Sequence, residues 1–378
     1  MPQSRSILDE IPPLDEIPSR THISVGDALK LADLDLFTLA TTADHLRERA
    51  CGDVVSFVVN RNINFTNVCV GECAFCAFCK LPPFELTLEQ ILEKVEEASR
   101  MGATEICIQG GLHPRMGTED YCEILETIRS HYPRMHLHAF SPMEVVHGAK
   151  NSGITIREAL TELRRSGLGS MPGTAAEILV DEVRRRICPK KLSTAQWVDV
   201  ITTAHALSIP TTATMMYGHV ESWRDRIEHI LLIRNIQQKT HGFTEFVPLP
   251  FMPHNSPLGE RVRFATGGVE DLKVYSIARI LLFGLVNNIQ ASWVKLGHKL
   301  AQVALLCGAN DLGGTLMEES ISSSAGGTAG QYTSPEHLRK LITEIGRVPR
   351  ERDTLYRLIG LRSLDYSQAL NRRERHTV

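Results

Sequence analysis

A cluster of four cysteines is the feature of this sequence that points most directly to chemistry. Cys69, Cys73, Cys76 and Cys79 lie within eleven residues of one another. Cysteine forms soft thiolates, so a cluster on a short segment indicates zinc, an iron–sulfur cluster or a disulfide. The first three have the spacing C-x3-C-x2-C, which supplies three thiolates and no fourth. A four-iron cubane held by three cysteines keeps one iron open, and an open iron can chelate a substrate.

The other uses of such a cluster fit the sequence less well. A structural zinc site draws paired ligands from two separated segments, and the chain has no second C-x2-C or H-x3-H pair. A bacterial ferredoxin run has its long gap last and a proline after it, whereas here the long gap comes first and Lys80 follows Cys79. Disulfide scaffolds are typical of small secreted proteins, and the N-terminal residues show no apolar signal core.

The spacing therefore predicts an iron–sulfur cluster held by Cys69, Cys73 and Cys76. The last three cysteines form a rival C-x2-C-x2-C set, which the spacing alone does not exclude.

Five stretches resemble a known family. The run from Cys69 to Cys76, C-V-G-E-C-A-F-C, resembles the motif of the radical S-adenosylmethionine (SAM) enzymes. The preceding run 62–67, N-I-N-F-T-N, resembles the branch of that superfamily that builds deazaflavins and menaquinone precursors. Residues 136–144, 171–179 and 308–319 resemble those members of the branch that join tyrosine to a ribityl uracil.

The resemblance implies a reaction, its cofactors and its partners. It implies a [4Fe-4S] cluster, SAM as cosubstrate, and transfer of the 4-hydroxybenzyl group of L-tyrosine to carbon 5 of 5-amino-6-(D-ribitylamino)uracil, a step in making a deazaflavin coenzyme core. It also implies a second radical SAM subunit and an electron donor such as ferredoxin or flavodoxin. The alternative is an enzyme of the futalosine route to menaquinone. Those relatives tend to carry a triple glycine where this chain has the run 172–177, P-G-T-A-A-E.

Composition and charge exclude several other classes of function. The chain has 378 residues, of which 43% are hydrophobic, and its 41 basic and 44 acidic residues give a net charge of −3. This balance offers no electrostatic reason for binding nucleic acid or an anionic membrane. No apolar run approaches the roughly eighteen residues of a membrane span. With nine cysteines and no signal core, we expect a reducing cytoplasm.

Short strands alternate with longer helices after the cysteine cluster. Strands are predicted at 54–59, 105–108, 135–139, 169–171, 211–216, 244–249 and 288–290. Helices are predicted at about 87–101, 119–130, 143–151, 156–166, 175–186, 194–207, 223–239, 270–284 and 297–306. About eight βα units indicate a (β/α)8 barrel. The sequence has no G-x-G-x-x-G loop, which a dinucleotide-binding fold would be expected to carry. Three parts are expected: an N-terminal arm (1–22) with two helices to residue 50, the barrel (51–320), and a loop with a helical tail (321–378).

Candidate SAM-binding residues occupy the predicted carboxyl ends of strands, where barrel enzymes place reactive groups. Gln109, Gly110 and Gly111 follow the second strand and resemble the glycine pair that binds the SAM amino group, although an ordinary βα turn also needs glycine. Phe75 is placed against adenine by the resemblance, or it shields the cluster. Glu177 is expected in the first turn of a helix, where a carboxylate complements the helix dipole; the resemblance makes it a SAM ligand.

Further candidates are proposed for SAM, substrate and proton handling. Ser141 is a candidate for SAM and Glu144 for substrate, although both would suit a helix start. His136 and His138 alternate on one strand and share a face, which makes His138 a substrate candidate. The remaining candidates come from three predicted loops: Thr174, for substrate; Tyr217 and His219, for catalysis; Gly218, for the adenine; Glu221, Asn310 and Asp311, for substrate.

Overall fold

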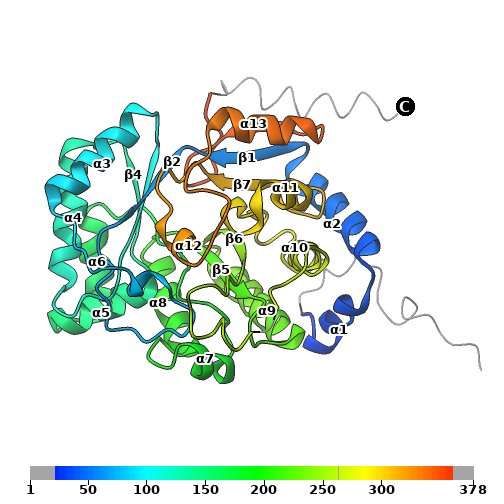
Figure 1. The fold of residues 1–378 in the computed structure, drawn as a ribbon, viewed down its shortest axis with the longest axis horizontal. Helices are drawn as coiled ribbons and strands as arrows, with labels where there is room; N and C mark the ends of the chain where they lie inside the picture. Colours follow the sequence, from blue (N-terminus) through cyan, green and yellow to red (C-terminus); the bar gives the residue numbers. More distant parts are fainter. Residues whose placement is uncertain (1–21, 263, 361–378) are drawn as a thin grey trace, which may run out of the picture.

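The computed structural model describes residues 22–262 and 264–360, and they form a barrel of parallel strands surrounded by helices (Figure 1). The strands are β1 (Val54–Val58), β2 (Asn60–Asn64), β3 (Glu105–Gln109), β4 (His136–Ala139), β5 (Thr211–Tyr217), β6 (Phe243–Pro250), β7 (Asp311–Gly314) and β8 (Val348–Glu351). Two further positions are filled by single parallel bridges at Ser170–Met171 and Ile289–Gln290. The predicted (β/α)8 architecture is confirmed.

The barrel closes through its first strand, which β1 and β2 form together. β1 pairs with β7, and β2 pairs with β3, both in parallel. Where the strand bends at Val59, the Thr315 amide donates to the Val58 carbonyl oxygen at 3.1 Å, and the Asn62 amide donates to the Leu316 carbonyl oxygen at 2.9 Å. The first and last barrel strands are therefore joined, and the ring has no open edge.

The helices follow the predicted alternation. They are α1 (Val25–Leu29), α2 (Leu36–Cys51), α3 (Leu88–Arg100), α4 (Thr118–His131), α5 (Pro142–Ser152), α6 (Ile156–Ser166), α7 (Asp181–Ile187), α8 (Thr194–Ala206), α9 (Trp223–Thr240), α10 (Gly268–Leu282), α11 (Trp293–Ala304), α12 (Ser320–Ser324) and α13 (Pro335–Glu344). Several begin at a serine or threonine whose side chain accepts from the third helical amide, as Thr87 does for α3. Among the described residues, no helix is both long and apolar enough to cross a lipid bilayer.

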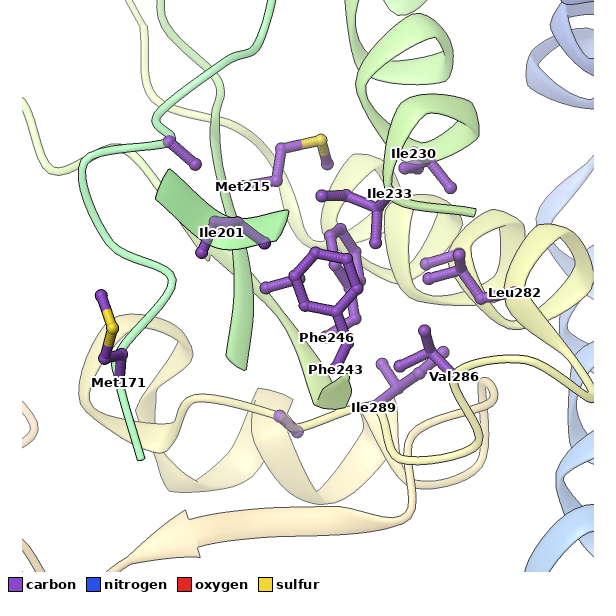
Figure 2. Close-up of a cluster of buried hydrophobic side chains, with 14 of the residues drawn as sticks. Met171, Ile201, Met215, Ile230, Ile233, Phe243, Phe246, Leu282, Val286 and Ile289 are labelled. Atoms are coloured by element: carbon purple, nitrogen blue, oxygen red, sulfur yellow. The ribbon is translucent and has the colours of Figure 1, made fainter. Parts of the chain in front are cut away.

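The apolar core lies between the barrel wall and the helices. Figure 2 shows Phe243 and Phe246 of β6 packed close to Ile230 and Ile233 of α9. These four side chains are all buried. Burial of large apolar groups on the outside of the strands fixes the wall and leaves the alternate side chains to face the interior.

The structure corrects the predictions for Glu177 and for the C-terminal segment. Glu177 does not lie in the first turn of a helix, because α7 begins only at Asp181 and Glu177 has a positive φ of 45°. The segment after Ile321, predicted as a loop and a helical tail, also contains the strand β8, which pairs in parallel with β1. The run Val348-Pro-Arg-Glu lacks the apolar alternation that identifies a strand, so it was missed. The predicted N-terminal arm (1–22) lies almost wholly outside the described residues.

Candidate functional site

A cavity of about 440 Å³ occupies the barrel interior and reaches the cysteine loop at the carboxyl ends of the strands. Alternate residues of the strands line it, for example Asn60, Asn62 and Asn64 of β2 and Glu105 and Gln109 of β3. All four clustered cysteines line the same cavity. One space therefore joins the candidate metal ligands to a polar interior.

Main-chain hydrogen bonds hold the cysteine loop on three sides. The Val70 amide donates to the Leu112 carbonyl oxygen at 3.0 Å, which ties the loop to the turn after β3. The Ala74 amide donates to the Ile187 carbonyl oxygen at 2.8 Å, at the end of α7. The Ala74 carbonyl oxygen in turn accepts from the Leu258 amide at 2.8 Å. The positions of the thiols are thus set by the barrel and not by the loop alone.

The cysteine arrangement fits a cluster better than a single ion. Within the described residues, no three side chains of Cys, His, Asp or Glu are close enough to hold one metal ion. Three thiolates that bind three different irons of a cubane stand farther apart than three ligands of one ion. Gly71 lies between two of them, since a Cβ atom there would be 3.1 Å from Cys69 Sγ and 3.9 Å from Cys73 Sγ. The donor set and its shared cavity therefore suit a [4Fe-4S] cluster.

Cys79 lies beside the predicted ligands and faces the same cavity. Its Sγ is 3.8 Å from the Cys76 carbonyl oxygen. Burial and the neighbouring Cys76 thiol raise the pKa of Cys79 to about 11. The geometry places Cys79 close to the set, so the choice of Cys69, Cys73 and Cys76 as the ligands remains a prediction from their spacing.

A lysine that the sequence analysis did not single out stands beside the cysteines. Lys191 Nζ is 2.5 Å from Glu177 Oε1 and 5.1 Å from the centre of the Phe75 ring. Burial opposes its charge, but Glu177 and Cys73 hold the pKa of Lys191 above its ordinary value. Burial raises the pKa of the Cys73 thiol to about 12, and the Lys191 ammonium counteracts that rise. Lys191 therefore supplies positive charge where thiolates must form.

The glycine pair after β3 is required by close packing. A Cβ atom on Gly110 would come within 2.5 Å of the Phe65 ring, and one on Gly111 within 2.4 Å of the Val68 carbonyl oxygen. Only residues without side chains allow this turn to lie against the segment that leads into the cysteine loop. The Gln109 side-chain amide donates to Thr174 Oγ1 at 2.7 Å, and both residues line the cavity.

Glu144 links the glycine turn to the start of α5. Its Oε1 accepts from the Gly110 amide at 2.9 Å, and its Oε2 accepts from the Ser141 amide at 2.7 Å. Burial raises the pKa of Glu144 to about 7, although these hydrogen bonds oppose the rise. Ser141 and Glu144 thus form the helix start that the sequence analysis considered, and both also line the cavity.

Charged and polar groups form the deep end of the cavity. Arg352, which follows β8, donates to Asp311 from Nε at 2.6 Å and from Nη2 at 3.0 Å. Burial raises the pKa of Glu245 to about 7, and its Oε2 accepts from Tyr356 Oη at 2.5 Å. His138 shares the Ser170 hydroxyl with His136 through ring contacts of 2.7 and 2.8 Å. Burial lowers the pKa of His138 to about 4, so it is neutral at physiological pH.

Some predicted residues lie elsewhere. Tyr217 is buried and donates to Asp271 Oδ1 at 2.9 Å. Glu221 Oε1 accepts from the Gly218 amide at 2.6 Å and from Arg226 Nε at 2.7 Å. The loop expected around residue 310 is the beginning of β7, where Asn310 accepts from Arg279. The predicted residues outside the cavity lining are Tyr217, Gly218, His219, Glu221, Asn310 and Asp311.

The sequence analysis did not single out several residues that line the cavity, and only three of them follow a recognisable sequence pattern. Asn60, Asn62 and Asn64 recur with the two-residue period of a strand, which places them on one face. Other missed residues are isolated in the sequence: Glu105, Lys191, Glu245, Gln290, Ser292, Lys295, Glu319, Arg352 and Thr354.

Comparisons with known proteins agree with this geometry. Residues 63–233 match the radical SAM superfamily, and residues 240–363 match the family described as the CofH/MqnC C-terminal region. The chain is 60% identical over 89% of its length to 5-amino-6-(D-ribitylamino)uracil–L-tyrosine 4-hydroxyphenyl transferase 1 of Methanosarcina barkeri, of which it covers 90%. It is 58% identical over 84% of its length to the transferase of that name from Archaeoglobus fulgidus, of which it covers 92%.

Solved structures share the fold. Methylornithine synthase (PylB) superimposes with a TM-score of 0.71 at 17% identity, over 94% of this chain and 99% of that one. The FeFe-hydrogenase maturase HydG from Carboxydothermus hydrogenoformans gives a TM-score of 0.71 at 14% identity, over 93% and 80%. At these identities the likeness concerns the architecture alone.

Proposed function

The chain belongs to the radical SAM superfamily and, within it, to the family of the 5-amino-6-(D-ribitylamino)uracil–L-tyrosine 4-hydroxyphenyl transferases. From this premise we propose that it transfers the 4-hydroxybenzyl group of L-tyrosine to carbon 5 of 5-amino-6-(D-ribitylamino)uracil. The Cα–Cβ bond of tyrosine breaks and a bond to the uracil ring forms, with loss of a two-carbon remnant. The product is an intermediate of deazaflavin synthesis.

The observation that carries this proposal is the single cavity that joins the cysteine loop to a polar barrel interior. A ribityl chain carries several hydroxyl groups, and the interior offers amide side chains such as Asn60, Asn62 and Gln290 as partners. Enclosure by the barrel also keeps bulk water from reactive species.

The cysteines would hold the cluster, and neighbouring residues would hold SAM. Cys69, Cys73 and Cys76 supply the three thiolates. When bound, the cluster supplies the electron that cleaves the sulfonium of SAM. Phe75 would pack against the cluster or the adenine, because it lines the cavity beside the cysteines, with Lys191 Nζ 5.1 Å from its ring centre.

The turn after β3 and the residues that face this turn would bind SAM. Gln109, Gly110, Gly111, Ser141 and Glu177 supply them, and all five line the cavity. Because Gly110 and Gly111 carry no side chains, a ligand can approach the backbone carbonyl groups of this turn.

Substrates would contact the polar side chains deeper in the barrel. His138 is neutral and lines the cavity, so its ring can donate to or accept from a uracil or a phenol. Glu144 and Thr174 line the same space. With a pKa of about 7, Glu144 can exchange a proton near neutral pH.

The reaction implies partners besides the two substrates. We propose that a low-potential donor such as ferredoxin or flavodoxin reduces the cluster, and that a second radical SAM subunit closes the deazaflavin ring. We place the protein in the cytoplasm, where reducing conditions keep its nine cysteines as thiols.

Product analysis tests this function. The protein is reconstituted anaerobically with iron and sulfide, reduced, and incubated with SAM, ring-labelled tyrosine and the ribityl uracil. Mass spectrometry should detect 5′-deoxyadenosine and a uracil product that carries the labelled ring. Formation of 5′-deoxyadenosine without the labelled adduct, together with turnover of a futalosine precursor, would favour the menaquinone branch instead.

A further inference from the structure

The basic side chains around the cavity differ in whether they have an acidic partner. Within the described residues, the lysines and arginines that line it are Lys191, Lys295 and Arg352. Lys191 is paired with Glu177 at 2.5 Å. Arg352 is paired with Asp311 at 2.6 Å. The Lys295 ammonium has neither a hydrogen bond nor an ion pair among these residues, so it is the cation left for a ligand.

The backbone holds Lys295 at the cavity wall. It lies in the first turn of α11, which Gly297, with a φ of 74°, separates from the rest of the helix. Ser292 and Val294 of the same turn also line the cavity. The carboxylates whose charges act on Lys295 are those of Glu319 and Glu177. Glu319 is engaged at Oε2 by the Ser322 amide at 2.8 Å, and Glu177 is paired with Lys191.

An unpaired lysine in this place is costly to the folded protein. Burial lowers the pKa of Lys295, because the ammonium loses water, and the charges of Glu319 and Glu177 offset this loss only in part. A ligand carboxylate would restore the missing partner and form a charge-assisted hydrogen bond.

The proposed substrates differ in charge. 5-Amino-6-(D-ribitylamino)uracil carries no carboxylate, whereas tyrosine carries one. SAM carries another, which the open iron of a bound cluster would take up together with the SAM amino group. We propose that Lys295 binds the α-carboxylate of tyrosine and so orients its Cα–Cβ bond in the cavity. This inference rests on the proposed function.

A binding cycle tests the assignment. The reconstituted protein with SAM is equilibrated with radiolabelled tyrosine or with tyramine, which lacks the carboxylate, and bound ligand is measured by equilibrium dialysis. The wild-type protein should prefer tyrosine. Lys295→Met should bind tyrosine about 10- to 100-fold more weakly, the usual effect of losing a hydrogen bond to a charged group. It should bind tyramine at least as tightly as the wild type, and Lys295→Arg should recover part of the preference.

Lys299→Met is the matched control, because Lys299 lies on the same helix and is exposed. It should keep the wild-type preference for tyrosine. Unchanged tyrosine binding by a folded Lys295→Met protein would overturn the proposal. Loss of SAM binding in that variant, with tyrosine binding intact, would also overturn it and assign the lysine to SAM. If the wild type does not bind tyrosine at all, the proposed function fails first.

Discussion

The charges beside the cysteine loop determine how its thiols behave. Cys73 is half-buried, and its partial loss of water disfavours the thiolate that an iron must bind. Lys191 is held charged by Glu177 and stands near enough to Cys73 to favour that thiolate. Lys191 would therefore favour the thiolate form of Cys73 when a cluster is assembled there.

Removal of one ligand should abolish the cluster without unfolding the barrel. In Cys73→Ala we expect loss of bound iron and of 5′-deoxyadenosine formation, with the far-ultraviolet circular dichroism spectrum unchanged. Cys79→Ala is the control and should keep both iron and activity, because the spacing makes it the spare cysteine. Iron analysis after anaerobic reconstitution measures the effect. Full iron in Cys73→Ala would contradict both ligand sets, because both include Cys73, whereas loss of iron in Cys79→Ala would support the rival set of Cys73, Cys76 and Cys79.

A pH effect on stability is expected from His138. Its pKa in the folded state is about 4, below the ordinary value of 6.5, because it is buried. Between these values the unfolded chain binds more protons, so folding weakens as pH falls. From about pH 7.5 to about pH 5.5 this group should remove about 1 kcal/mol of stability.

Anaerobic urea unfolding of the wild type and of His138→Asn at the two pH values measures this difference. The wild type should lose about 1 kcal/mol more than the variant. Equal losses would mean that His138 is not held neutral by burial. His205 and His229, whose pKa values are also lowered, contribute equally to both proteins and cancel.

At the scale of elements, the turn after β3 and the cysteine loop form one unit. The Gly111 amide donates to the Thr66 carbonyl oxygen at 2.7 Å, and the Val70 amide donates back to the Leu112 carbonyl oxygen. These hydrogen bonds require the two segments to lie so close together that a side chain on Gly111 would not fit between them.

Gly111→Ala should separate these two segments. Its Cβ atom would stand 2.4 Å from the Val68 carbonyl oxygen, one residue before Cys69. We expect a loss of about 1–3 kcal/mol in the free energy of unfolding and faster release of iron to a chelator. Gly26→Ala, in an exposed helical position where a Cβ atom would meet only Ser24 Oγ at 3.8 Å, should neither lower the free energy of unfolding nor speed iron release. Iron release as slow as in the wild type would show that the loop does not depend on this packing.

Helices and strands were predicted from the sequence more accurately than the set of residues that come together around the cavity. Periodicity identified most helices and strands, because the residues of each element that contact the core repeat locally. The strand-five constellation of Tyr217, His219 and Glu221 was placed at the active site by its order in the chain. None of the three lines the cavity, and Glu221 accepts hydrogen bonds from the Gly218 and His219 amides within the same turn. Lys191 and Lys295 were missed because a lone lysine has no pattern.

At the scale of the whole molecule, the C-terminal segment packs at the end of the barrel where β1 begins. β8 pairs with the beginning of β1, and the Arg352 amide then donates to the Phe57 carbonyl oxygen at 2.9 Å. The Arg352 guanidinium enters the interior and neutralises Asp311, which is wholly buried. Residues far apart in the chain thereby form one buried charge cluster under the cavity.

Arg352→Met should be strongly destabilising. It leaves the buried carboxylate of Asp311 without its cation, which costs about 3–5 kcal/mol in comparable buried pairs. Arg357→Met is the control, because its side chain is 75% exposed in an ion pair with Asp353; it should cost about 0–1 kcal/mol. Chemical unfolding under anaerobic conditions measures both. Similar losses of unfolding free energy in the two variants would contradict a structural role for the buried ion pair of Arg352 and Asp311.

The most direct test of the account concerns the iron that the three thiolates leave open. Electron–nuclear double resonance of the reduced protein, with SAM carrying nitrogen-15 in its amino group and oxygen-17 in its carboxylate, reports whether both groups bind the cluster. The account predicts hyperfine coupling to both labels, in the wild type and in Cys79→Ala alike. A spectrum without coupling, from a cluster held by four cysteines including Cys79, would contradict it.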